Sequence, residues 1–158
     1  MTQTRPFLIA TLVAVVVAIL GGFASQPGDW YDGLNKASLT PPNWAFGPAW
    51  TLIYLTCIVA AGLGWRAARS SDQKRWLDII FFANAALNVV WSVLFFTMQR
   101  HDLELFEVAA LWGSVAALIL YLRGITRVGS GLLLPYLGWV SFAAYLNYQV
   151  VALNPAFG

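Results

Sequence analysis

Five long apolar stretches constrain the fold of this 158-residue chain, and the connections between them, short except for the first, carry most of the charge. A helix needs about 20 apolar residues to cross the hydrocarbon core of a bilayer. Only 10% of the residues are charged, whereas soluble domains carry about 25%. The pattern predicts an all-α integral, multi-pass membrane protein, a five-helix transmembrane bundle forming a single domain over residues 1–158. The expected helices cover residues 6–25, 44–67, 76–98, 104–122 and 130–153.

Basic residues are distributed unevenly between the two ends of the expected bundle. The end with the N-terminus and the second and fourth connections carries seven, and the other end carries only Lys36 and Arg100. This asymmetry predicts the N-terminus inside and the C-terminus outside, whichever membrane holds the protein. The first apolar run is longer than the core of a signal peptide and lacks a clear cleavage site, so we expect it to be retained as a helix.

The connection between the first two helices, residues 26–43, is long and rich in aromatic residues and proline. A long loop between membrane spans is typically functional. We interpret its first half, with Trp30, Leu34 and Lys36, as a lid over one end of the bundle. The segment from Trp44 to Trp50 is better interpreted as the start of the second helix and part of a pocket wall.

Polar and aromatic side chains recur at helical spacing within three of the apolar stretches, which places each set on one helix face. They are Trp50 and Tyr54; Asn84, Asn88, Trp91 and Phe95; and Tyr136, Trp139, Ala143, Leu146 and Asn147. One interpretation is that the amides join helices and the indoles fill the bundle. The other is a pocket for a flat, mostly apolar ligand, and the convergence of three such faces favours it.

Conventional catalytic and metal-binding patterns are absent from the sequence. No Cys/His cluster has metal-ligand spacing, Cys57 is the only cysteine, and the net charge of +2 comes without a basic run that would suggest nucleic acid. His101 lies in the short third connection and is expected to be an exposed loop residue rather than a haem ligand. Pro135 lies inside the fifth expected helix and should kink it.

The motifs together resemble those of the TspO/MBR family, also called the translocator protein, peripheral-type benzodiazepine receptor or tryptophan-rich sensory protein family. The resemblance is carried by Trp30-Tyr-x-x-Leu-x-Lys36, Pro41-Pro-x-Trp-x-Phe-x-Pro-x-Trp50, Asn88-x-x-Trp-Ser-x-x-Phe-Phe96 and Pro135-Tyr-x-x-Trp-x-x-Phe-Ala-x-x-Leu-Asn147. It implies a five-helix bundle, often a homodimer, with a pocket closed by the first loop. By motif position, the implied ligand-binding residues are Tyr31, Pro42, Trp50, Asn88, Trp91, Trp139, Ala143 and Leu146, and Tyr54 joins them.

The resemblance also implies a ligand class. Family members bind porphyrins and other tetrapyrroles, as well as isoquinoline- and benzodiazepine-type molecules, and no cofactor is obligatory. The C-terminal segment after Leu146-Asn-Tyr148 lacks the basic residue of the motif proposed for cholesterol, which indicates a bacterial-type member. Three hypotheses follow: a tetrapyrrole sensor or receptor, a light-dependent porphyrin-degrading activity that would use Trp50, Trp139 and Tyr31, and a transporter of porphyrins or sterol-like ligands.

Overall fold

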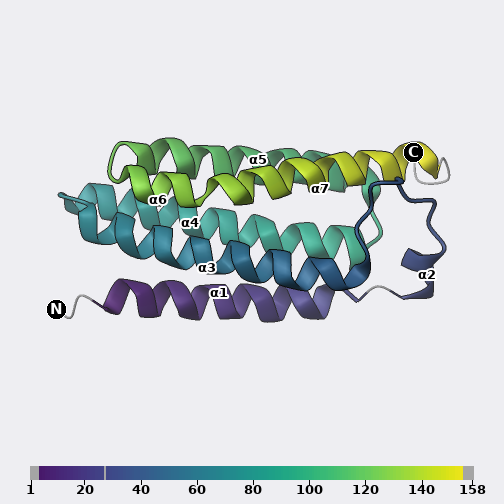
Figure 1. Ribbon diagram of the computed structural model, residues 1–158, viewed down its shortest axis with the longest axis horizontal. Coiled ribbons are helices and arrows are strands. Elements are labelled where there is room, and N and C mark those ends of the chain that lie inside the picture. The colour runs from purple at the N-terminus through teal and green to yellow at the C-terminus, as the bar shows by residue number, and fades with distance from the viewer. Residues whose placement is uncertain (1–3, 27, 155–158) are drawn as a thin grey trace.

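The computed structural model describes residues 4–26 and 28–154, and within them every regular element is a helix. Five helices are long and apolar enough to cross a membrane, which confirms the predicted fold class. They lie side by side along one axis, and the two chain ends lie at opposite ends of the bundle (Figure 1). The spans are α1 (Arg5–Ala24), α3 (Asn43–Ala67), α4 (Ser71–Ser92) with its extension η1 (Val93–Thr97), α5 (His101–Arg123), and α6 (Arg127–Leu132) with α7 (Leu134–Leu153).

Helix α5 packs along both α4 and α7 and carries the best-buried apolar side chains. Val115, Leu118 and Leu122 on α5 are completely buried and form core clusters with residues of α3, α4 and α7. Helix α1 packs on the outer side of α3 and of α4 with its extension η1, and it buries few of its residues. The helices therefore pack tightly around α5, whereas α1 packs loosely on α3 and α4.

The fifth span begins at Arg127 rather than 130, and two other helix starts also differ from the sequence-based prediction by three residues or more. The third span begins at Ser71 rather than 76, because the Ser70 side chain caps it by accepting a hydrogen bond from the backbone N–H of Gln73. The fourth span begins at His101 rather than 104. Both connections are thus shorter than predicted, and polar residues that had been assigned to loops belong to helices.

The prediction that Pro135 kinks the fifth helix from within is wrong. Leu133 separates α6 from α7, and Pro135 lies in the first turn of α7. In a first turn the missing N–H of proline has no intrahelical partner to lose, so the residue starts a helix there instead of distorting one.

The segment η1 is a π-helical turn that continues α4 at the end of the third span. Such wider turns are rare and occur frequently at functional sites. Here the turn carries Phe95 and Phe96, whose rings are in edge-to-face contact at 4.6 Å. Both rings face the lid.

The lid, described over residues 28–42, contains the short helix α2 (Asp29–Asp32) and lies at the end of the bundle opposite the start of α1 (Figure 1). Its far part is attached to the end of α7 by a reciprocal pair of hydrogen bonds. The Asn154 side chain accepts from the backbone N–H of Asn35 at 3.0 Å and donates to the backbone carbonyl of Asn35 at 2.9 Å. Chain segments more than 100 residues apart in sequence therefore hold the lid closed.

Candidate functional site

Three tryptophans from three different spans meet in the half of the bundle nearest the lid. The ring of Trp50 on α3 lies 6.2 Å from that of Trp91 on α4 and 6.4 Å from that of Trp139 on α7. Trp50 also stacks on Tyr54, one helical turn further along α3, at 5.7 Å. These distances are typical of aromatic contact. The convergence predicted from helical spacing is present in the structure, and we call this group the aromatic cluster.

A chain of hydrogen bonds borders the aromatic cluster on the side away from the lid. The Tyr54 hydroxyl donates to Oδ1 of Asn88 at 3.4 Å, and Nδ2 of Asn88 donates to the Tyr136 hydroxyl at 3.2 Å. Tyr136 donates in turn to Asn84 at 3.3 Å, and Asn84 donates to Ser114 at 2.8 Å. Asn84 thus joins helices, as the packing interpretation proposed. Asn88 does so too, but it also lies one turn from Trp91 and borders the site.

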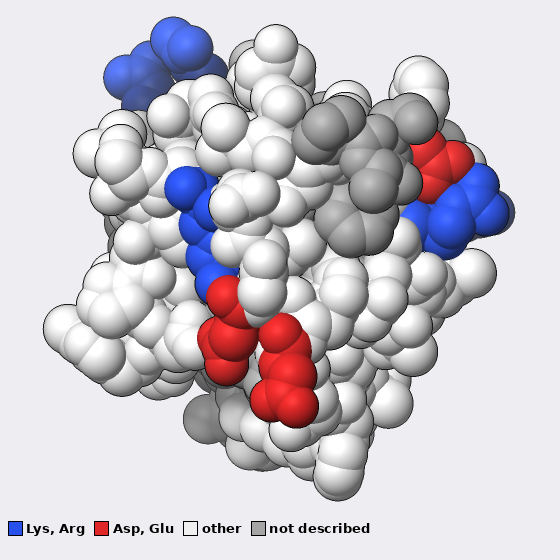
Figure 2. Space-filling view, turned by 90° about the vertical axis from the view of Figure 1, so that its right-hand side faces the viewer, with Lys and Arg blue, Asp and Glu red and all other residues white. Residues whose placement is uncertain are grey.

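The lid inserts two apolar side chains into the bundle. Tyr31 and Leu34 are buried, and the Tyr31 ring contacts Phe95 at 6.2 Å and Phe96 at 5.7 Å. Burial, with a smaller contribution from the nearby Asp32 carboxylate, raises the pKa of the Tyr31 phenol, so it remains a neutral hydrogen-bond donor at physiological pH. The outer face of this end carries its charged side chains in separate groups among uncharged surface (Figure 2).

Lys36 covers the Tyr31 ring from outside. Its ammonium nitrogen lies 4.4 Å from the ring centroid and 3.5 Å from the backbone carbonyl oxygen of Asp32. A cation over an aromatic face is held by the ring quadrupole. Lys36 is therefore placed beside the lid's buried anchor with its charge still near solvent.

A cavity with mostly apolar walls lies next to the aromatic cluster rather than within it. It has a volume of about 520 Å³ and is enclosed by α1, α3 and α4. Tyr54, Asn88 and Tyr136 line its inner end, whereas Trp50, Trp91 and Trp139 do not line it. The hydrogen-bond chain thus separates an open cavity from an aromatic cluster whose rings already touch one another.

Comparison with known proteins places this arrangement in a family. The sequence matches the TspO/MBR family over residues 10–153. The chain belongs to the TspO/MBR family. It is 38% identical to "Tryptophan-rich protein TspO" of Archaeoglobus fulgidus, covering 93% of this chain and 96% of that protein. It is 34% identical to "Tryptophan-rich sensory protein" of Cereibacter sphaeroides, over 84% and 82% of the two chains. A "Translocator protein" of Sus scrofa is 31% identical over 85% and 84%.

Not every residue carried over from the family motifs is enclosed in this member. Pro42, at the start of α3, is exposed, and Ala143 and Leu146 on α7 are half-buried one and two turns beyond Trp139. Tyr31, Asn88 and Trp91 are buried, and Trp50, Tyr54 and Trp139 are half-buried. The structure brings the aromatic residues together and leaves the remaining three at the margin.

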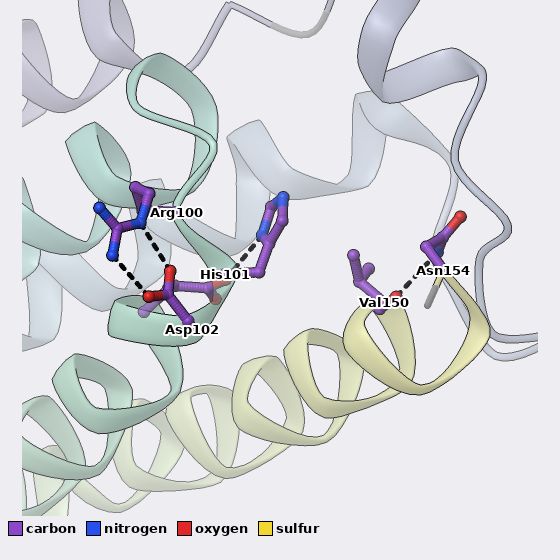
Figure 3. A network of polar contacts seen from close by, with 6 residues as sticks. Arg100, His101, Asp102, Val150 and Asn154 are labelled. Atoms are coloured by element: carbon purple, nitrogen blue, oxygen red, sulfur yellow. Dashed lines mark hydrogen bonds and ion pairs between the residues drawn. The ribbon is translucent and has the colours of Figure 1, made fainter. Parts of the chain in front are cut away.

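His101 was predicted to be an exposed loop residue, and that prediction is wrong. It is the first residue of α5, is only 1% exposed, and stacks flat on the lid's Trp30 with ring centroids 5.4 Å apart and planes 2° apart. Its Nδ1 lies 3.2 Å from Oε2 of Glu104, while Arg100 and Asp102 pair with each other at the surface (Figure 3). His101 is therefore part of the surface against which the lid packs.

Two buried carboxyl groups on α5 were also missed. Glu104 is fully buried and Glu107 is 8% exposed, and both Glu107 oxygens lack a hydrogen-bond partner in the described part of the chain. Their burial could have been predicted from helical spacing. One helical face contains three apolar residues, Val108, Leu111 and Val115, and also His101, Glu104 and Glu107. The prediction of a loop at Arg100-His-Asp left this face unrecognised.

Proposed function

We propose that this protein is a membrane receptor for tetrapyrroles, which bind between Trp50, Trp91 and Trp139 beneath the lid. The observation that carries the proposal is the meeting of three indoles from three spans under a loop anchored by the buried Tyr31. Large flat rings gain most of their binding free energy by stacking on aromatic faces, while a few polar groups fix their orientation.

Binding at this site requires the cluster to open. The indole centroids are only 6.2 and 6.4 Å apart, so a flat ligand must separate them and displace the lid's aromatic contacts. The adjoining hydrogen-bond chain can then present Tyr54 and Asn88 to the ligand, and the neutral Tyr31 phenol can donate from the lid. In this proposal Lys36, at the outer side of the lid, binds a propionate carboxylate at the entrance.

Topology and assembly form part of the proposal. The excess of basic residues at the end where α1 begins favours that end as the inside, with the lid outside. A homodimer is proposed from the exposed row of Ala109, Gly113 and Ala117 on α5, where small side chains allow close helix contact. Isoquinoline- and benzodiazepine-type molecules are proposed as competitors for the same aromatic walls.

The proposal is tested by titrating the purified protein with protoporphyrin and following the shift of the porphyrin Soret band. Replacing Trp50, Trp91 and Trp139 together by Phe should raise the dissociation constant about 100-fold, taking about 1 kcal/mol for each lost indole contact. The matched control replaces Trp44, Trp76 and Trp112, which are 75%, 55% and 43% exposed, by Phe. Equal affinity in the two triple variants would refute the site.

A second candidate is light-dependent breakdown of the bound porphyrin. It is favoured by the position of Trp50, whose ring contacts those of Tyr54, Trp91, Tyr136 and Trp139. Such a set of touching oxidisable rings could exchange electrons with an excited ligand, and Tyr31 would lie at its lid side. Illumination of the complex should then bleach the Soret band faster than illumination of porphyrin in detergent alone. Equal bleaching would remove this candidate.

A further inference from the structure

The cavity beneath α1 extends from Tyr54 and Asn88, beside the aromatic cluster, to Arg5 and Asp78 near the starts of α1 and α4. Its lining begins at Arg5, the first residue of α1, and continues to Val17. Its walls are almost entirely apolar, and Arg5 and Asp78 are the only charged residues among the described residues that line it. The loose packing of α1 on α3 and α4 creates this space.

The depth of the cavity matches one leaflet of a bilayer. The lining from Arg5 to Val17 spans about 18 Å of helix, at 1.5 Å per residue. The hydrocarbon core of a bilayer is about 30 Å thick, so one leaflet contributes about 15 Å. A chain that enters beside Arg5 therefore reaches the middle of the membrane at the inner end of the cavity.

The inner end of the cavity does not require a polar ligand. Its polar residues are Tyr54, Asn84, Asn88 and Tyr136, and they bond to one another and to Ser114. Groups that are already paired lose little when hydrocarbon rather than water lies against them. The cavity is thus suited to a flexible apolar chain rather than to a molecule that must bring hydrogen-bonding groups to the membrane centre.

The cavity adjoins a shallow groove at the start of α4. Ser71, Lys74, Arg75 and Asp78 line this groove together with the apolar Ile79 and Phe82, and Asp78 and Phe82 also line the cavity. Together with Arg5, the corner presents three cations and one carboxylate. The N-terminus of the long helix α4 adds its partial positive charge. Basic pockets of this kind between transmembrane helices recognise anionic lipid headgroups.

We propose that the cavity and the groove form a binding site for an anionic glycerophospholipid. One acyl chain fills the space between α1, α3 and α4, the phosphate is bound by Arg5, Lys74 and Arg75, and Asp78 accepts a hydrogen bond from a headgroup hydroxyl. This site differs from the proposed tetrapyrrole site in its walls: the three tryptophans of the aromatic cluster do not line it, and the two sites share only Tyr54 and Asn88 at the inner end of the cavity.

The headgroup part of the site is tested by adding lipids to the delipidated protein and measuring bound lipid by native mass spectrometry. Phosphatidylglycerol should bind more tightly than phosphatidylcholine with identical acyl chains. Arg5 and Arg75 are exposed, so replacing both by Gln should leave the fold intact and weaken phosphatidylglycerol about 25-fold, about fivefold for each charge. Phosphatidylcholine, whose choline cation offsets its phosphate, should be weakened less, and equal binding of the two lipids by the unaltered protein would overturn the proposal.

The acyl-chain part is tested with a pair of matched substitutions on α1. Ala14 lines the cavity, whereas Ala18, one turn further on, is exposed and does not. Ala14→Leu should reduce phosphatidylglycerol binding at least tenfold, and Ala18→Leu should leave it unchanged. Equal binding by both variants would overturn the cavity assignment, and so would displacement of the lipid by protoporphyrin, which would assign the cavity to the tetrapyrrole. If Ala14→Leu does not fold, the Arg5/Arg75 variant decides.

Discussion

Replacing Asn154 by Ala should loosen the lid without altering the aromatic cluster beneath it. Asn154 makes two hydrogen bonds to the backbone of Asn35, at 3.0 and 2.9 Å, and a third to the carbonyl of Val150 within α7 at 2.8 Å (Figure 3). Only the first two cross from α7 to the lid. A weaker bond from the Asn35 side chain to the backbone of Leu153, at 3.4 Å, remains in the variant.

The magnitude follows from those two bonds. Both are exposed, so each contributes about 0.5–1 kcal/mol, the lower part of the usual range. Their loss, about 1–2 kcal/mol in total, should raise the population of the open lid roughly 5- to 30-fold.

Hydrogen exchange of the lid amides, measured by mass spectrometry, reports this population directly. Peptides covering residues 29–36 should exchange faster by that factor, and peptides from the middle of α5 should be unchanged. Asn154→Asp is the matched control, because it keeps the oxygen that accepts from the Asn35 N–H and removes the donor, so its effect should be about half. Unchanged exchange in Asn154→Ala would refute the reasoning that this pair holds the lid.

Three further outcomes are expected. A Cβ on Gly64 would lie 2.6 Å from a methyl carbon of Leu122. Gly64→Ala should therefore destabilise the protein by about 1–3 kcal/mol, as measured by thermal unfolding. The control Gly113→Ala should not destabilise it, because nothing lies within 4 Å of a Cβ at that position. His101→Ala should remove the ring on which the lid's indole stacks and shift that indole's emission, and unchanged emission would contradict the stack. Because the pKa of Tyr31 is raised above its ordinary 10.0, its contribution to lid closure should be constant below pH 10 and be lost as pH rises through the raised value; lid exchange that accelerates already at pH 7–9 would count against this.

The fold and the wall of the site could be predicted because both depend on local periodicity. Uncharged runs of about 20 residues can only span the membrane as helices. Within such a helix, spacings of three and four place Asn88, Trp91 and Phe95 on one face wherever the helix packs. Tyr31 and Leu34 could be assigned to a lid because an aromatic loop between two spans has few other places to lie.

The features that escaped prediction depend on helix ends and on packing. His101 follows Arg100 in a short polar segment, and nothing local shows that α5 begins there. Its stack on Trp30 joins segments 71 residues apart in sequence. Pro135 is compatible with both a kink and a helix start, and only the break at Leu133 decides between them.

The cavity, too, could not be predicted from local sequence patterns. It exists because α1 packs on the outer side of α3 and α4 and leaves a space between them. The apolar run of α1 contains no signal for that arrangement.

The most direct test of the central claim is the structure of the protein bound to protoporphyrin. The account predicts that the ring lies between Trp50, Trp91 and Trp139, with the indole centroids farther apart than the 6.2 and 6.4 Å described above, and with Tyr31 of the lid against the ligand. A porphyrin bound elsewhere, with the three indoles still in mutual contact, would contradict it.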